Sequence, residues 1–520
     1  MRRTVTACLT LTTVFLFLST AFFFTPQVAG QNQPPIIVRT RSGFVQGEIT
    51  GQLRSFRGIP YAAPPVGDLR WRPPARTPRW DGIRDATTFA SMCIQIDANG
   101  NLVGSEDCLT LNVFTSSTEQ PRNQPVMVFF HGGGNKRGSS QQPWFDHPQL
   151  VNQGVIVVTA EYRLGVLGFF AHPLLTAEGN GSSSNYGLMD QIAALAWVQD
   201  NIRAFGGDPS RVMVFGQSAG SYDIQALLAS PAARGLFSRA GMESGAIPRG
   251  QSLSLADGEA ASAPFVPRVG CDNAQDVLGC LRAVPADVVV NNQDGIPFVI
   301  TIEPRVLPKD SFDVLEQSGS PVPLLIGSTS EEAAVPPKPL DAAGYEARIH
   351  LEFDPFGPGT GDQVLALYPV SDYDTPWYAL VGVASDFNVT CEVRSTALAA
   401  AVGHQQPVWR YLFTHRFQND PGLNELRAFH IAELFFVFGN LHNILSVPYE
   451  PTTAEIELSN RMMRYWTQFA RYGNPNGLGP VEWRRYPGDA ETMLELDTPP
   501  RQISGYHIPQ CNFLATLPQP

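Results

Sequence analysis

The chain has 520 residues, of which 43% are hydrophobic and 16% are charged, and its formal net charge is −12. This composition is typical of a globular protein with a large core, and it excludes a disordered or fibrous chain. Because the balance is acidic and no basic run occurs, nucleic acids and anionic membrane surfaces are not expected partners.

The first thirty residues have the layout of a secretory signal peptide. Arg2 and Arg3 precede an apolar run from Leu9 to Phe24, and small residues follow at 28–30. A membrane anchor is the alternative, but Thr and Ser interrupt the run and no second segment of spanning length follows. We expect residues 1–30 to be removed, residues 31–520 to form a single domain without a membrane anchor, and the protein to be secreted to an extracellular or periplasmic location.

Six cysteines follow the signal segment, an even number that suits disulfide formation in an oxidising compartment. Local spacing favours two short-range pairs and leaves a long-range third: Cys93–Cys108, Cys271–Cys280 and Cys391–Cys511. Buried free thiols are the alternative. Two three-residue patterns, at Asn180 and Asn388, match N-glycosylation acceptors, and they matter only if the host glycosylates.

Short apolar runs alternate with helical stretches along the chain. Because these runs are continuously apolar, they are typical of strands buried on both faces of a sheet. We expect such strands at 125–130, 155–159, 212–215, 323–326 and 408–413. Between the second and third, a helix from Leu188 to Arg203 ends at the turn formed by 206–209. This order predicts an α/β fold with a large, mostly parallel sheet flanked by helices.

Two segments, at about 250–308 and 336–386, are richer in Pro, Gly and Asp and show weaker periodicity. They do not continue the alternation of strand and helix. We therefore expect insertions that cover the active edge of the sheet and form the walls of a gorge.

The sequence Gly216-Gln217-Ser218-Ala219-Gly220 directly follows the strand at 212–215 and precedes a helical stretch. The GxSxG pattern alone is weak, but a strand, a sharp turn and a helix are the context that a nucleophile elbow requires. Side chains in place of the two glycines would collide with neighbouring strands. The sequence therefore predicts that Ser218 is a catalytic nucleophile.

A serine nucleophile needs an imidazole base, and the base needs a carboxylate to orient it. In α/β-hydrolases both follow the serine in the chain, the acid before the histidine. Glu331 and Glu332 come just after the strand at 323–326, and the residues alone do not choose between them. Among the later histidines, His430 precedes a dense apolar segment that would anchor its loop, although a structural histidine is the alternative.

A run of three glycines, at 132–134, follows the strand at 125–130. Such a loop can supply backbone N–H donors to the oxyanion that develops during acyl transfer. An ordinary flexible turn is the alternative. Phosphate binding is disfavoured because no Lys and Ser/Thr follow at the P-loop spacing.

Longer motifs occur in order from about Val38 onward: FRGIPYAAPPVG from Phe56, SEDCLTLN from Ser105, YRLGVLGF from Tyr162, NYGLMDQ from Asn185 and FGGDP from Phe205, followed by the elbow. In these motifs the chain closely resembles type B carboxylesterases, which include cholinesterases, fungal lipases and bacterial esterases. The resemblance covers most of the chain. It implies an α/β-hydrolase fold and a secreted serine carboxylesterase that acts on a small-molecule ester without a metal or an organic cofactor.

The resemblance also assigns roles to individual residues. It implies a triad of Ser218, Glu332 and His430, with an acyl-enzyme on the serine. The implied oxyanion donors are Gly133, Gly134 and Ala219. The disulfide pairing above matches the family pattern, and two structural ion pairs are implied: Arg70–Glu106 and Arg163–Asp190.

Departures from the family pattern narrow the expected substrate. Residues 94–107 contain no aromatic side chain to hold a choline group, and this loop is short where related lipases carry a long lid. Gln217 replaces the usual Glu and so removes a negative charge beside the nucleophile. Asn135, Lys136 and Arg137 form a polar, basic patch after the glycines, where relatives more often have an aromatic residue.

We expect Asn135, Lys136 and Gln217 to bind substrate, and the basic patch suggests an ester with a polar or anionic acyl group. Side chains that simply point to solvent are the alternative. Two other functions are considered, a lipase for longer-chain acylglycerols and a noncatalytic, cholinesterase-like binding protein. The second is disfavoured because the nucleophile, acid, base and glycines are all present.

Overall fold

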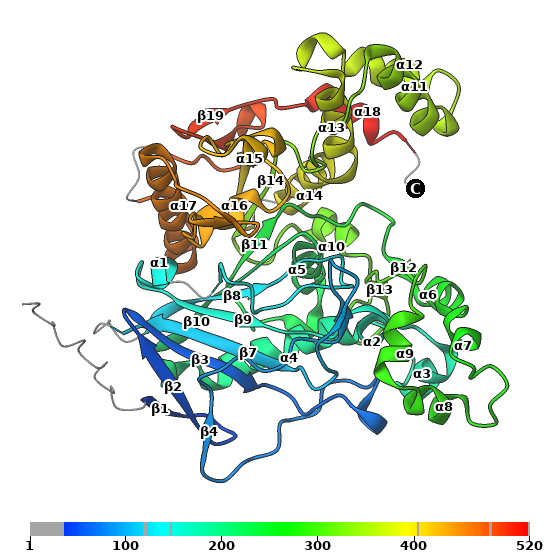
Figure 1. Cartoon of the computed structure of the whole chain (residues 1–520), viewed down its shortest axis with the longest axis vertical. Helices are drawn as coiled ribbons and strands as arrows, with labels where there is room; N and C mark the ends of the chain where they lie inside the picture. The colour runs from blue at the N-terminus through cyan, green and yellow to red at the C-terminus, as the bar shows by residue number, and fades with distance from the viewer. Residues whose placement is uncertain (1–35, 118–122, 146–147, 403–404, 478–480, 518–520) are drawn as a thin grey trace, which may run out of the picture. The chain divides into compact units, whose positions relative to one another are not determined.

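The computed structural model describes residues 36–117, 123–145, 148–402, 405–477 and 481–517 (Figure 1). The expected signal peptide lies outside these residues. Within the described ranges, no helix is both long enough and apolar enough to cross a membrane.

A large mixed sheet runs through the described chain in the order β1-β2-β3-β7-β9-β8-β10-β11-β14-β15-β18-β19, with β4 beside β2. The six neighbouring pairs from β9 to β18 are all parallel, and antiparallel strands flank this block on both sides. The strands are β1 (Ile36–Arg39), β2 (Phe44–Thr50), β3 (Leu53–Pro60), β4 (Ile83–Asp85), β7 (Thr110–Ser116), β8 (Gln124–Phe130), β9 (Ile156–Ala160), β10 (Gly207–Gln217), β11 (Arg239–Glu243), β14 (Leu324–Thr329), β15 (Val408–Phe413), β18 (Met493–Leu496) and β19 (Arg501–Ile503). Short two-stranded sheets add β5 (Gln95–Ile96) with β6 (Leu102–Val103), β12 (Leu253–Ser254) with β13 (Thr301–Ile302), and β16 (Asn443–Ile444) with β17 (Val447–Pro448).

Helices cover both faces of the sheet. The longer ones are α4 (Tyr186–Asn201), α5 (Ala219–Ala229), α10 (Ser311–Ser318), α11 (Ala342–Phe353), α12 (Thr360–Leu367), α13 (Pro376–Ser385), α14 (Cys391–Ala400) and α17 (Thr453–Tyr472). The shorter ones are α1 (Pro148–Val151), α2 (Gly165–Phe169), α3 (Pro173–Glu178), α6 (Leu255–Ser262), α7 (Phe265–Arg268), α8 (Val277–Ala283), α9 (Ala286–Asn291), α15 (Pro421–Leu426), α16 (Ala432–Val437) and α18 (Ile508–Leu514).

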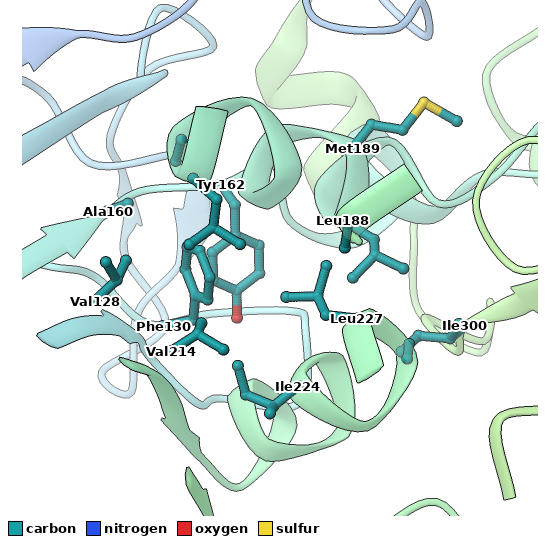
Figure 2. Packing of buried hydrophobic residues seen from close by; sticks show 14 of the residues in the cluster. Val128, Phe130, Ala160, Tyr162, Leu188, Met189, Val214, Ile224, Leu227 and Ile300 are labelled. Carbon is teal, nitrogen blue, oxygen red and sulfur yellow. The ribbon is translucent and has the colours of Figure 1, made fainter. Parts of the chain in front are cut away.

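The two faces of each central strand enter different cores. In β8, Val128 and Phe130 pack into a cluster with α4 and α5, whereas Met127 and Phe129 pack into a second cluster with α16 and α17. Figure 2 shows the first cluster, in which strand side chains meet helical residues such as Ile224. Burial on both faces is the physical reason why these strands are continuously apolar.

The five strands and the central helix expected from the sequence are confirmed. The strand expected at 212–215 is longer, because β10 starts at Gly207 and its register with β8 shifts before Val212. The helix expected from Leu188 is α4, which continues as a 3₁₀ turn over Ile202–Phe205. Gly206 ends this turn with φ +96°, a left-handed conformation that suits glycine.

The two insertions are mainly helical. The first carries α6 to α9 and the second carries α11 to α13, and Figure 1 shows the latter gathered with α18. A π-helix over Asp386–Thr390 joins α13 to α14.

Three disulfides are present with the expected partners: Cys93–Cys108, Cys271–Cys280 and Cys391–Cys511. The third ties the start of α14 to α18.

Candidate active site

Several chain segments of the site meet at one edge of the sheet because parallel strands end there together. The glycine loop follows β8, Ser218 follows β10, and Glu332 comes three residues after β14. Strands β8, β10, β11 and β14 are hydrogen-bonded neighbours. Ligands of open α/β sheets bind at the carboxyl ends of such strands.

Ser218 occupies the sharp turn between β10 and α5. Its backbone has φ +58° and ψ −124°, a strained conformation for a residue other than glycine. A Cβ on Gly216 would lie 2.6 Å from the carbonyl carbon of Gly220, and one on Gly220 would lie 2.2 Å from the carbonyl oxygen of Phe130. Both glycines are therefore needed for the turn to pack against the β8 strand end.

His430 and Glu332 form a hydrogen-bonded pair through Nδ1 and Oε2. The other oxygen of Glu332 accepts the backbone N–H of Thr329 at 2.7 Å, which fixes the carboxylate. Burial opposes the imidazolium form, but the Glu332 carboxylate outweighs it and raises the pKa of His430 above its ordinary value. The pair can hold one tautomer of the imidazole and stabilise a proton taken up at Nε2.

The adjacent acid, Glu331, has a different environment. Its carboxylate lies 3.8 Å from Arg427 and 4.0 Å from Arg416, and it accepts the backbone N–H of Ala428 at 3.3 Å. Of the two acids that the residues alone left open, only Glu332 contacts His430. The other described histidines past the elbow lie outside the cavity lining, and His404 lies outside the described residues.

The glycine loop approaches the elbow closely. A Cβ on Gly132 would lie 2.8 Å from the Cβ of Ser218, and one on Gly133, where φ is +115°, would lie 2.0 Å from the carbonyl oxygen of Arg137. Gly134 and Ala219 line the same cavity as Ser218. The glycine loop and the start of α5 thus both border the cavity that Ser218 lines.

Two of the three residues expected to bind substrate are placed differently by the structure. Lys136 forms an ion pair with Asp294, with 2.7 Å between Nζ and Oδ1, and it does not line the cavity. Gln217 is buried beside His430, and its Nε2 lies 3.0 Å from the Nε2 of the imidazole. Asn135 does line the cavity, and its side-chain amide donates to Asp223 at 3.1 Å.

The sequence reasoning missed a pair of buried carboxylates behind the histidine. Glu433 accepts the hydroxyl of Ser244 at 2.6 Å, and burial raises its pKa to about 7. Glu243 accepts the indole N–H of Trp466 at 2.5 Å, and burial raises its pKa well above the ordinary range. Glu433 stands three residues after His430, and an acid within such an apolar segment was the signal available.

A cavity of about 550 Å³ opens over Ser218. Its walls come from the segment after β11, the first insertion and the π-helix: Ala246, Ile247, Pro248, Gln251, Ser252, Phe298, Val299, Ile300, Phe387, Asn388 and Val389, with Tyr222 from α5. Glu332 and His430 line this cavity together with Ser218. No Lys or Arg is among the residues that line it.

The remaining sequence expectations fall outside this cavity or at its margin. The expected ion pairs are present, Arg70–Glu106 at 2.6 Å and Arg163–Asp190 at 2.7 Å. Both acceptor asparagines, Asn180 and Asn388, are exposed. In the described part of the chain, no group of three or more His, Cys, Asp or Glu side chains is placed to hold a metal ion.

A mostly parallel sheet whose carboxyl edge carries a serine in a strand-to-helix turn is the architecture of an α/β-hydrolase. A solved structure of a PNB esterase is similar. The alignment covers 92% of this chain and 99% of the esterase chain, with a TM-score of 0.77 and 33% sequence identity.

The family model described as the carboxylesterase family matches residues 34–342 and 362–514. Fumonisin B1 esterase of Sphingopyxis macrogoltabida is 36% identical over 500 residues, which are 90% of this chain and 87% of that protein. Para-nitrobenzyl esterase of Bacillus subtilis is 36% identical over 487 residues, which are 89% of this chain and 95% of that protein. The chain belongs to the carboxylesterase family, and it is a carboxylic ester hydrolase.

Proposed function

We propose that the protein is a secreted esterase that forms an acyl-enzyme on Ser218 and prefers esters with an uncharged, polar acyl group. The observation that carries the catalytic part is the hydrogen bond between His430 and Glu332 in the cavity that Ser218 also lines. A secreted location is supported by the signal layout of residues 1–30 and by three disulfides.

The proposed reaction has two halves. The hydroxyl of Ser218 attacks the ester carbonyl while Nε2 of His430 takes its proton, and Glu332 stabilises the imidazolium. Backbone N–H groups of Gly133, Gly134 and Ala219 stabilise the oxyanion. The alcohol leaves with the proton from His430, and water, activated by the same imidazole, then releases the acid.

Replacing the nucleophile tests this mechanism. Ser218→Ala is expected to lower kcat for a chromogenic butyrate ester by at least about 10⁴-fold, because the hydroxyl that forms the acyl-enzyme is gone. Burst kinetics and steady-state hydrolysis measure this, and circular dichroism checks the fold. Retention of a substantial fraction of wild-type activity by a folded variant contradicts the assignment.

The acyl preference follows from the cavity lining. Gln251, Ser252 and Asn388 offer neutral donors and acceptors among apolar walls, whereas the side-chain amide of Asn135 is bonded to Asp223 and Tyr162. An anionic acyl group finds no Lys or Arg in this lining, and Lys136 is already paired with Asp294. Burying an unpaired carboxylate there is unfavourable. This lining supports an uncharged polar acyl group more than an anionic one.

A panel of esters with one alcohol tests the preference. We expect kcat/KM to be highest for a hydroxyl-bearing short acyl group, lower for the matched alkyl ester, and at least about tenfold lower for the carboxylate-bearing one. Lys136→Ala should leave these ratios unchanged. A carboxylate-bearing ester that is preferred, and loses its preference in Lys136→Ala, restores the anionic hypothesis. Faster hydrolysis of emulsified long-chain acylglycerols would favour a lipase.

A further inference from the structure

The proposed oxyanion hole is built from two separate segments. Gly133 and Gly134 belong to the loop after β8, whereas Ala219 is the first residue of α5. Oxyanion donors must lie within about 2.7–3.1 Å of the developing charge, so the loop and the helix have to be held in register. A side chain that connects the two segments would set that register.

Asp223 makes such a connection. It lies one helical turn after Ala219 on α5 and is fully buried. Its Oδ1 accepts the side-chain amide of Asn135 at 3.1 Å, and Asn135 directly follows Gly134. Asn135 has φ +54°, so the loop turns sharply at this residue. The carboxylate thus bonds the end of the glycine loop to the helix that carries the third donor.

The surrounding contacts brace both partners. The single hydroxyl proton of Tyr162 is shared between the carbonyl oxygen of His131 at 2.7 Å and Oδ1 of Asn135 at 3.2 Å. Gln191, from α4, donates its side-chain amide to Oδ2 of Asp223 at 2.5 Å. The glycine loop is therefore fixed at both ends, at His131 and at Asn135.

Stability alone is a poor explanation for this carboxylate. Asp190, which is equally buried, forms an ion pair with Arg163, but the hydrogen-bond partners of Asp223 among the described residues are two neutral amides. Burial raises the pKa of Asp223 to about 7, although both amides lower it. An apolar residue of similar volume would avoid this desolvation.

We propose that Asp223 is a positioning residue that clamps the glycine loop to α5 and so holds the two halves of the oxyanion hole in register. The inference rests on the proposed function, because it concerns the same reaction. Asp223 touches no reacting atom, and it acts through Asn135.

Kinetics of single and double variants test the clamp. Asp223→Ala and Asn135→Ala are each expected to lower kcat by about 10- to 100-fold, because small misplacements of catalytic groups have effects of this size. Since the oxyanion forms only in the transition state, KM should change by less than about threefold. The kcat of the double variant should be no lower than that of the less active single variant, because both substitutions remove the same hydrogen bond.

Asp223→Asn is the conservative variant. Oε1 of Gln191 has no hydrogen-bond partner among the described residues, so this amide can rotate and accept the new N–H. The remaining oxygen at position 223 can still accept from Asn135. We expect a loss below about fivefold.

Glu455→Ala is the matched control. Glu455 is also a fully buried carboxylate, and its partners His415 and Tyr449 do not line the cavity. This variant should lower Tm and keep kcat for the folded protein.

Three results overturn the clamp: wild-type kcat in folded Asp223→Ala, additive losses in the double variant, or a loss in Asp223→Asn as large as in Asp223→Ala. If Asp223→Ala does not fold, kcat of Asn135→Ala and of Asp223→Asn decide, and wild-type kcat in folded Asn135→Ala overturns the clamp. If wild-type protein hydrolyses the ester no faster than Ser218→Ala, the proposed function itself is refuted.

Discussion

At the scale of single residues, the hydrogen bond between Gln217 and His430 is the contact that most directly concerns the base. Gln217 Nε2 lies 3.0 Å from Nε2 of the imidazole, the atom that takes the proton of Ser218 in the proposed reaction. An amide N–H donated to this atom stabilises the neutral imidazole. In the proposed reaction, this hydrogen bond has to break before Nε2 can take the proton of Ser218.

Gln217→Glu should reverse this effect. A carboxylate in place of the amide stabilises the imidazolium and raises the pKa of His430 further, so the acid limb of kcat/KM should move to higher pH by about one unit. The reaction needs neutral imidazole, so activity on the acid side should fall. A pH profile of kcat/KM measures the shift, and Gln217→Ala serves as the uncharged control. An acid limb in the same place for wild type and Gln217→Glu contradicts the prediction.

At the scale of elements, close backbone approach holds α5 against the end of β8. The Cα of Gly220 faces the carbonyl oxygen of Phe130, so the elbow sits on the strand end without an intervening side chain. This approach also brings the start of α5 next to the glycine loop. The element geometry and the site geometry are therefore coupled.

Gly220→Ala should be destabilising because its Cβ would lie 2.2 Å from the Phe130 carbonyl oxygen. We expect the free energy of unfolding to fall by about 1–3 kcal/mol, with a loss of kcat as α5 shifts. Gly258→Ala in α6 is the matched control, since its Cβ would meet ordinary contacts of 3.4–3.5 Å. Urea unfolding compares the two. Equal free energies of unfolding for the two variants would show that the fold tolerates a side chain at position 220.

At the scale of the whole molecule, the long-range disulfide connects the late helices. Cys391 and Cys511 are 120 residues apart, and they join a small core of α11, α12, α13 and α18 to the π-helix that lines the cavity. His507 supports the same junction, because its Nδ1 lies 2.6 Å from Asp386. The C-terminal helix thus helps to hold one wall of the cavity.

Removing disulfides should cost stability in proportion to the logarithm of loop length. Replacing Cys391 and Cys511 by Ala should lower the free energy of unfolding by up to about 5 kcal/mol, and replacing Cys271 and Cys280, nine residues apart, by up to about 2.5 kcal/mol. Denaturant titration under oxidising conditions measures both losses. A larger loss for the short loop would contradict this order.

Local patterns in the sequence are enough to predict several features of the fold and the site. Continuous apolar runs located the five buried strands, and the strand, turn and helix around Ser218 located the elbow. Cysteine spacing predicted the disulfide pairs found in the structure. Residues close in the chain carry these signals, because strand burial and tight turns act on a few consecutive residues.

Contacts between side chains that are far apart in the chain depend on the folded structure. It brings Glu332 to His430 across 98 positions, a pairing that the family resemblance implied but the residues alone left open, and it pairs Lys136 with Asp294 across 158. It also places Asp223 against Asn135, 88 positions earlier. Each contact depends on how loops from different strands converge at one edge of the sheet, and no local pattern records that convergence.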